Sequence, residues 1–236
     1  MWDFEQGEVL AFDKPLHWTS FDLVAKVRHN VCRKIGKKKL KVGHSGTLDP
    51  LATGVVIVCT GKKTKLIDQL QYDVKEYIAT LQLGATTPSF DLEKEIDATY
   101  PTEHITRELI DKTIPEFVGE QWQVPPMFSA VQINGKRAYE FARKGESVEL
   151  KPKLLVIDEI EVLDFDEEKK QLTIRVVCSK GTYIRALARD IGDRLGSGAH
   201  LTALRRTRVG DTRVEDCLTI DTFLEQLKQY DYVQNE

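Results

Sequence analysis

The sequence predicts an α+β fold built around a largely antiparallel sheet that is flanked by helices. Strand and helix patterns follow one another without the regular alternation of a doubly wound parallel sheet. Residues 154–165 and 171–178 are predicted to form a β-hairpin around the charged turn at 166–170. Residues 77–83 alternate between two faces, as a strand with one buried side does. The chain has 236 residues and is 41% hydrophobic, so it can bury a sizeable core.

The remaining elements are assigned from local signals. A helix is expected to begin at Thr19 or Ser20, because either side chain can cap it and apolar residues then recur at helical spacing. A second amphipathic helix is expected to end at Gly196. Two adjacent prolines exclude residues 124–128 from a central strand, because proline lacks an amide donor. We predict further strands at 9–12 and 55–59. Helices are predicted at 20–31, 63–72, 106–117, 138–144 and 184–195, and loops at 33–54 and 85–103.

The distribution of charge favours a nucleic-acid partner more than its sum does. The net charge is −3 and the isoelectric point is about 6.0, which at first argues against such a partner. Basic residues, however, crowd segments 33–41, 62–65 and 205–208, whereas acidic residues collect at 91–116 and 158–168. Segregated charge can present a basic face to phosphates. A solvated, lysine-rich loop is an equally good interpretation of segment 33–41 alone.

Cysteine usage and hydropathy indicate a soluble cytoplasmic protein. The four cysteines lie far apart and form no C-x-x-C pair, so neither a disulfide framework nor a zinc site is expected. The five histidines are scattered, so no metal is expected either. No apolar run approaches membrane-spanning length, and residues 1–20 do not resemble a signal peptide. No strongly apolar surface stripe requires a partner, so we expect a monomer.

Residues 43–54, GHSGTLDPLATG, form the most unusual segment of the chain. Their glycines permit close approach of another molecule, but the spacing fits neither a P-loop nor a nucleophile elbow. Asp49 precedes a proline, and such aspartates commonly cap local amides in turns. A carboxylate in a phosphate-attracting segment would repel the RNA backbone, so catalysis is the competing interpretation. An ionised nucleophile of this kind would need a cationic partner.

Residues 179–185 supply a candidate partner at a strand-to-helix junction. Tyr183 and Arg185 face the same side if the chain is extended there, and diverge by about 200° if it is helical. The structural alternatives are a surface arginine on the helix and a core aromatic at Tyr183. Tyr77, at the start of its strand, is likewise more often a core residue than a site residue.

These segments together resemble the TruB family of tRNA pseudouridine synthases. The resemblance covers roughly residues 7–220, and five motifs recur in the family's order. They are residues 43–54, 75–77, 126–130 with 135–139, 178–185 and 198–206. Ser45 stands where the family often has threonine.

The resemblance implies an isomerase that converts the uridine at position 55, in the TΨC loop of tRNA, into pseudouridine without cofactor or metal. It implies the pseudouridine-synthase fold, with a catalytic domain over residues 1–220 and an insertion at about 124–145 that clasps the RNA. Such chemistry requires that the target base first be flipped out of the folded loop. The family usually carries a C-terminal PUA domain, whereas only a short tail is expected here at residues 221–236.

The resemblance also assigns the catalytic residues. Asp49 would be the nucleophile, Arg185 would pair with its carboxylate, and Tyr77 would stack on the target base and help to deprotonate C5. Whether Asp49 first attacks the sugar or the base is left open.

Substrate-binding roles follow in the same way. Tyr183 and Leu204 would line the uracil pocket, and His44 would pack against the T-loop and hold the flipped nucleotide. Basic residues at 33–41 and 205–208 would neutralise phosphates. The loop at 84–91 differs from the acidic turn expected of the family and receives no role.

Two other functions remain open at this point. A relative of the same fold could act within a guide-RNA particle, although the missing PUA domain argues against a guide RNA. A non-catalytic module that binds or folds tRNA is the second alternative, and the presence of Asp49, Tyr77 and Arg185 argues against it.

Overall fold

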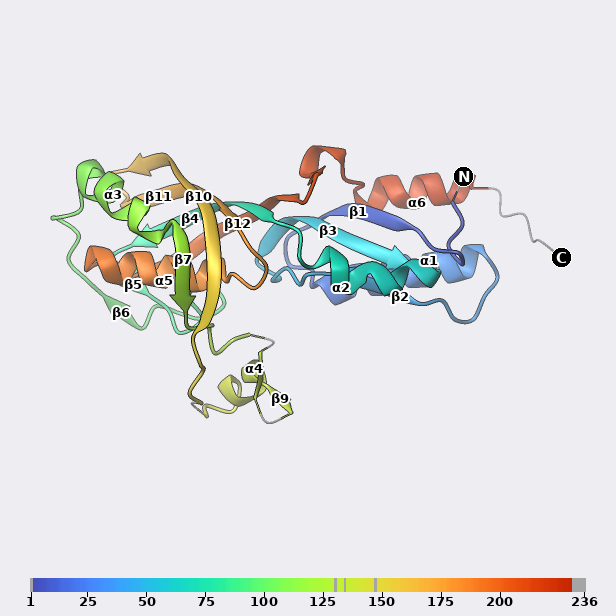
Figure 1. The fold of residues 1–236 in the computed structure, drawn as a ribbon, viewed down its shortest axis with the longest axis horizontal. Coiled ribbons are helices and arrows are strands. Elements are labelled where there is room, and N and C mark those ends of the chain that lie inside the picture. The colour runs from blue at the N-terminus through green and yellow to red at the C-terminus, as the bar shows by residue number, and fades with distance from the viewer. Residues whose placement is uncertain (1, 130, 134, 147, 231–236) are drawn as a thin grey trace. The chain divides into compact units, whose positions relative to one another are not determined.

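The computed structural model describes residues 2–129, 131–133, 135–146 and 148–230 (Figure 1). The chain divides into two compact units. Unit 1 comprises Met1–Lys75 with Arg205–Glu236, and unit 2 comprises Glu76–Leu204. Both contain helices packed with antiparallel strands, which confirms the predicted α+β class.

Unit 1 is built around a sheet with the strand order β1-β3-β12, in which β2 also pairs with β3 and β13 with β12. The strands are β1 (Val9–Lys14), β2 (Val42–Ser45), β3 (Ala52–Thr60), β12 (Ala199–Val209) and β13 (Thr212–Arg213). Strands β1 and β2 both run antiparallel to β3, with Lys14 opposite Gly54 and Ser45 opposite Ile57. The connection between β2 and β3 contains the glycine-rich segment.

Helices α1 (Ser20–Lys34) and α6 (Ile220–Gln229) belong to unit 1, with the short 3-10 helix η1 (Gly61–Leu66) and α2 (Ile67–Leu70). Thr19, not Ser20, is the N-cap of α1, and it forms a capping box with Asp22. The predicted apolar stripe of α1 is buried. Phe12 on β1 and Phe223 on α6 pack edge to face, with ring centroids 5.3 Å apart.

Unit 2 is organised by a sheet with the order β12-β4-β11-β10-β7, and β4 and β12 continue into unit 1. The strands new to this sheet are β4 (Lys75–Leu83), β7 (Gly119–Gln123), β10 (Lys153–Asp166) and β11 (Gln171–Cys178). The predicted hairpin is confirmed, with Asp166 opposite Gln171. The predicted buried face of β4 is also confirmed.

The helices of unit 2 are α3 (Arg107–Thr113), the 3-10 helix η2 (Ile114–Phe117), α4 (Ala138–Ala142) and α5 (Ile184–Leu195). Two short strand pairs complete this unit, β5 (Ala85–Thr86) with β6 (Ala98–Thr99), and β8 (Gln132–Ile133) with β9 (Lys136–Arg137). Of these elements, α4 and β9 lie in a lobe that projects away from the sheet (Figure 1). Helix α5 ends as expected at Gly196, whose φ of 69° closes the last turn.

Three differences from the sequence prediction matter. Strand β2 lies within the segment expected to be loop. Its residues carry no strand pattern in the sequence, but pairing with β3 satisfies its backbone hydrogen-bonding groups. Strands β7 and β12 were not expected, and β7 is likewise held by its partner β10. The helix expected at 106–117 changes to a 3-10 helix at Ile114–Phe117. The C-terminal tail expected at residues 221–236 lies largely within α6 (Ile220–Gln229), and its residues 231–236 lie outside the described residues.

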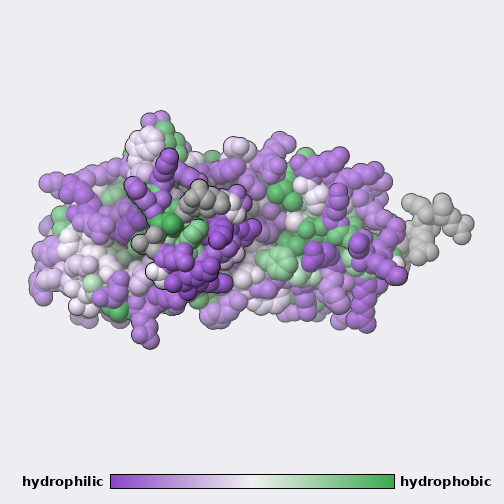
Figure 2. All heavy atoms as spheres, turned by 90° about the horizontal axis from the view of Figure 1, so that it is seen from below, coloured by the Kyte–Doolittle hydropathy of each residue, from purple (hydrophilic) through white to green (hydrophobic). Residues whose placement is uncertain are grey.

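Hydrophilic side chains cover most of the face shown in Figure 2, and hydrophobic residues appear there in smaller patches. Within the described ranges, no helix is long and apolar enough to cross a membrane.

Gly54 places β3 directly against β12. A Cβ atom added to Gly54 would lie 2.1 Å from the carbonyl oxygen of Arg206, closer than any real contact. Its φ of 111° is also in the region that disfavours side chains. The close approach of these two strands therefore requires glycine.

We expect Gly54→Ala to destabilise the protein by on the order of 2–4 kcal/mol, because the new methyl group collides with backbone and adopts a strained φ. Urea denaturation measures the change. Gly36→Ala is the control, since Gly36 has a φ of 68° and nothing within 4 Å of an added Cβ. It should cost only about 1 kcal/mol. Equal losses in the two variants would contradict the steric argument.

Candidate active site

Asp49 lies in the connection between β2 and β3, within unit 1, and is half-buried. We call residues 46–52 the Asp49 turn. The backbone N–H of Ala52 donates to the carbonyl of Asp49 at 3.0 Å, which closes the turn. The side chain of Leu48 is only 4% exposed, so the residue before Asp49 is anchored in the core. Gly46 opens the connection with a φ of 77°.

The side chain of Arg206 forms hydrogen bonds with the backbone of this turn. Its side chain is 1% exposed. Its Nε donates to the carbonyl of Val55 at 2.7 Å, while Nη2 and Nη1 donate to the carbonyls of Gly46 and Thr47 at 3.2 and 3.4 Å. A buried guanidinium with these partners serves the fold. The expectation that residues 205–208 neutralise phosphates is therefore wrong for Arg206.

Arg205, the neighbour of Arg206 on β12, is also engaged within unit 1. Its Nη2 pairs with Asp13 Oδ2 at 2.8 Å, and Nη1 donates to Thr53 Oγ1 at 3.1 Å. This arginine is partly exposed, so the ion pair ties β12 to β1 at the surface. The adjacent Arg205 and Arg206 therefore have different structural roles: Arg205 forms an ion pair at the surface, and Arg206 forms buried hydrogen bonds.

Lys14 is a second buried cation beside the turn. Its side chain is fully buried, and its ammonium donates to the carbonyls of Trp18 at 2.6 Å and Pro15 at 3.0 Å. The pKa of Lys14 is lowered to about 8, chiefly by burial and also by the charge of Arg206, against the carboxylate of Asp49, which acts to raise it. The charges of Lys14 and Asp49 therefore stabilise each other.

His44 belongs to β2 and lies opposite Val58 of β3. Burial, followed by the positive charge of Arg206, lowers the pKa of His44 below its ordinary value of 6.5. The imidazole is therefore neutral at pH 7. A neutral ring suits the packing role that the family resemblance assigns to it.

The other candidate residues belong to unit 2. Tyr77 is 8% exposed, on the buried face of β4. Leu204 is half-buried on β12. Tyr183 is half-buried and extended, with φ −98° and ψ 108°, and α5 begins only after it. Gln123 fixes its backbone, because the Tyr183 N–H donates to Oε1 at 2.9 Å and its carbonyl accepts from Nε2 at 3.2 Å.

Arg185 follows in the first turn of α5 and is 5% exposed, so the interpretation of a surface arginine is wrong. Its Nη1 donates to the carbonyl of Ser89 at 3.2 Å, and Nη2 donates to the carbonyl of Phe128 at 2.9 Å. Its Nε lies 3.7 Å from Asp91 Oδ2. The guanidinium is thus oriented by the loop that received no role and by the segment expected to clasp RNA.

Asp91 is the residue that sequence reasoning missed. It is 6% exposed, and its backbone carbonyl accepts hydrogen bonds from Thr87 at 2.6 Å and Ser89 at 3.3 Å, so the loop is internally braced. No spacing pattern connects Asp91 with Arg185, because the two residues are far apart in the chain. The available signal was a carboxylate placed between the apolar Phe90 and Leu92.

The structure brings the candidate residues together in two groups. In unit 1, Asp49 and Arg206 both act electrostatically on Lys14, and Arg206 also acts on His44. In unit 2, Arg185 is paired with Asp91. The pairing of Asp49 with Arg185 remains a prediction. Among the residues that the structure describes, no group of three or more His, Cys, Asp or Glu side chains could hold a metal ion.

Two solved structures share this fold. A chain of a Cbf5-Nop10-Gar1 complex is similar to this chain, with a TM-score of 0.68 and 28% sequence identity. The match covers 94% of this chain and 54% of that chain. An H/ACA RNP bound to a substrate RNA containing 2'-deoxyuridine gives 0.67 and 26%, covering 97% and 57%. This chain therefore spans about half the length of those proteins. The likeness confirms the predicted pseudouridine-synthase fold.

Sequence comparison is more specific. The model for the TruB family pseudouridylate synthase N-terminal domain matches residues 33–184, and that for the tRNA pseudouridylate synthase B C-terminal domain matches 185–236. "tRNA pseudouridine synthase B" of Phocaeicola vulgatus is 68% identical over 227 residues, covering 96% of both chains. The protein of that name from Bacteroides thetaiotaomicron is 65% identical, covering 99% of this chain and 98% of its own. The chain belongs to the TruB family of pseudouridylate synthases.

The buried state of Lys14 predicts a pH dependence of stability. Its pKa falls from 10.5 in the unfolded chain to about 8, so between these values the unfolded chain holds a proton that the folded chain has released. The free energy of unfolding should therefore rise with pH, by about 2 kcal/mol between pH 8 and pH 10 from this group.

Urea denaturation at several pH values measures this effect. Lys14→Met should remove the rise, whereas Lys38→Met, which alters an exposed lysine, should keep it. An unchanged pH dependence in Lys14→Met would contradict the assignment.

Proposed function

We propose that this protein converts uridine to pseudouridine at position 55 in the T-loop of tRNA, with Asp49 as the nucleophile. The observation that carries the proposal is a carboxylate on a turn fixed by buried hydrogen bonds, within a chain of the TruB family. The names of relatives 65–68% identical over nearly the whole of both chains support tRNA as the substrate. Family resemblance supplies the position in the tRNA.

The reaction is an isomerisation and is balanced without a co-reactant. The bond between N1 of uracil and C1′ of ribose breaks, and a bond between C5 and C1′ forms. The proton on C5 leaves, and N1 gains one. The uracil ring must be detached, turned and reattached while it stays in the site. An enclosed pocket and a covalent link to the enzyme both serve that requirement.

The proposed roles match the environment of each residue. Asp49 acts through its carboxylate, which interacts favourably with the buried ammonium of Lys14. Arg185 has its guanidinium oriented by Asp91 and by two backbone carbonyls, so it can present a charge with little reorganisation.

Three residues are proposed to contact the uracil ring. Tyr77, Tyr183 and Leu204 offer aromatic and aliphatic surface for a stacked base, in place of the stacking that the flipped uridine loses. The mostly buried position of Tyr77 supports an enclosed pocket. His44, which is neutral at pH 7, can pack against nucleotides of the T-loop.

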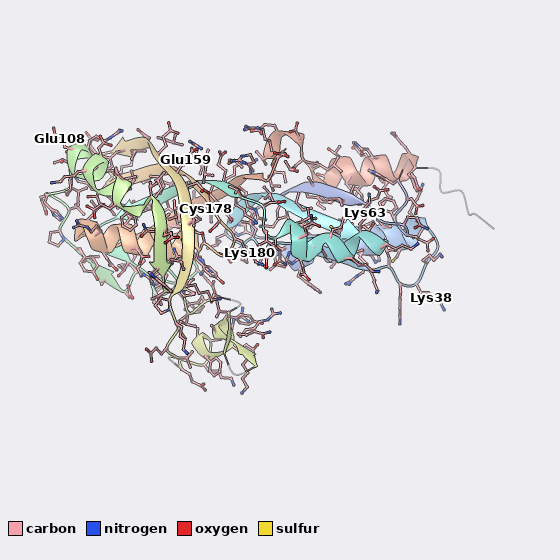
Figure 3. The ribbon with its side chains drawn as sticks, in the orientation of Figure 1. Lys38, Lys63, Glu108, Glu159, Cys178 and Lys180 are labelled. Atoms are coloured by element: carbon pink, nitrogen blue, oxygen red, sulfur yellow. The ribbon has the colours of Figure 1, made fainter. Side chains whose placement is uncertain are left out.

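The basic segment at 33–41 supplies charge for the RNA backbone. Lys38 extends outward from the loop between α1 and β2 (Figure 3), and Lys39 and Lys41 are exposed as well. Lys37 is partly offset by an ion pair with Glu5 at 2.8 Å. The exposed lysines are therefore the better candidates for contacts with phosphates.

Asp49→Asn tests the nucleophile. It should abolish pseudouridine formation on an unmodified tRNA transcript while tRNA affinity changes by less than about threefold, because an amide cannot attack as a carboxylate does. Chemical mapping of pseudouridine measures the activity, and a filter-binding assay measures the affinity. Wild-type protein should modify position 55 under the same conditions. Full activity of Asp49→Asn would remove the nucleophile assignment. A wild-type protein that binds tRNA but modifies nothing would favour the non-catalytic alternative.

The basic segment is tested by reversing the charge of Lys38 and Lys39 together. Loss of two phosphate contacts should weaken tRNA binding and reduce the slope of log K against log salt by about 1–2. The matched control reverses Lys112 and Lys169, which are exposed lysines of unit 2. If both double variants keep the wild-type slope, the segment does not contact the backbone.

A further inference from the structure

We propose that Ser20 is a positioning residue for the reaction, because its hydroxyl fixes the residue that immediately precedes Asp49. The inference rests on the proposed role of Asp49 as the nucleophile. Ser20 is the first residue of α1 and is 2% exposed. As a positioning residue it does not touch the substrate and acts only through the Asp49 turn.

The contact is reciprocal. The backbone N–H of Leu48 donates to Ser20 Oγ at 2.9 Å, and Ser20 Oγ donates in turn to the carbonyl of Leu48 at 3.3 Å. One hydroxyl thus satisfies both backbone polar groups of a single residue. The side chain of Leu48 is buried, so neither group has ready access to water.

Ser20 is itself held in place. Thr19, the preceding residue, caps α1, and its Oγ1 accepts from the Asp22 N–H at 3.0 Å. The Asp22 carboxylate returns the contact, because Oδ2 accepts from the Thr19 N–H at 2.8 Å and from its hydroxyl at 2.6 Å. The capping box fixes the backbone from which the Ser20 hydroxyl projects.

The other flank of Asp49 is held by the same stretch of chain. The backbone N–H of His17 donates to the carbonyl of Pro50 at 2.8 Å. His17 has a φ of 66°, an unusual value for a residue with a side chain. Segment 17–22 therefore holds the backbone on both sides of Asp49.

Such restraint has a chemical consequence. A nucleophile reacts fast only when it is held close to the attack geometry, and small displacements are costly. Loss of the Ser20 hydroxyl leaves two buried backbone groups of Leu48 without their partner. The turn can then relax toward water and carry Asp49 with it.

Ser45 offers a matched control in the same region. It is 1% exposed, at the end of β2, and its Oγ has no hydrogen-bond partner among the described residues. Ser45→Ala therefore removes the same atom from a similarly buried position without breaking a hydrogen bond. Such a change is expected to be nearly neutral for folding.

The experiment compares Ser20→Ala with Ser45→Ala at saturating tRNA in single-turnover conditions. Ser20→Ala should lower the rate about 10- to 100-fold, which is the scale expected for a misplaced reactive group. Ser45→Ala should stay within about twofold of wild type, and both variants should keep tRNA affinity within about threefold. Ser20→Thr keeps the hydroxyl and should restore most of the rate. Equal rates for Ser20→Ala and wild type, or no rescue by Ser20→Thr, would overturn the proposal.

Hydrogen exchange supplies a readout that does not depend on catalysis. The Leu48 amide should exchange faster in Ser20→Ala and at the wild-type rate in Ser45→Ala. Unchanged exchange in Ser20→Ala would contradict the anchor itself. Different results would overturn the role of Asp49 and the role of Ser20. An active Asp49→Asn variant overturns the nucleophile, whereas an inactive Asp49→Asn beside a fully active Ser20→Ala overturns only the role of Ser20.

Discussion

The hydrogen bonds of the buried Arg206 guanidinium are the interaction on which the Asp49 turn depends. A cation removed from water is costly unless hydrogen bonds satisfy its donors. The carbonyls of Val55, Gly46 and Thr47 supply those bonds, so the connection between β2 and β3 must turn its backbone inward. Gly54 lets β12 approach closely enough for this to occur. Arg206 therefore fixes the start of the Asp49 turn, at Gly46 and Thr47.

The same arrangement explains the electrostatics around Asp49. The pKa of Lys14 is lowered to about 8, chiefly by burial and also by the positive charge of Arg206. The carboxylate of Asp49 acts in the opposite direction. In unit 2, Arg185 and Asp91 form a second buried pair of opposite charges. Each group of charges is braced by backbone hydrogen bonds, which limits reorganisation during a reaction.

Much of the fold could be predicted from local sequence patterns. The alternation along β4, the hairpin of β10 and β11 and the glycine that ends α5 each depend on neighbouring residues. Long-range pairing could not be predicted, which is why β2 and β12 were missed. For the site, Asp49 and Arg185 stood out through motifs, whereas the burial of Arg206 and the partnership of Asp91 depend on contacts between distant segments.

In the proposed function, this chain alone performs the isomerisation on tRNA. The most direct measurement mixes purified protein, free of other RNA and protein, with an unmodified tRNA transcript and maps pseudouridine along the whole molecule. A parallel transcript carries cytidine at position 55. We expect one modified site, at position 55 of the first transcript, and none in the second. Modification elsewhere, or only after a guide RNA is added, would contradict it.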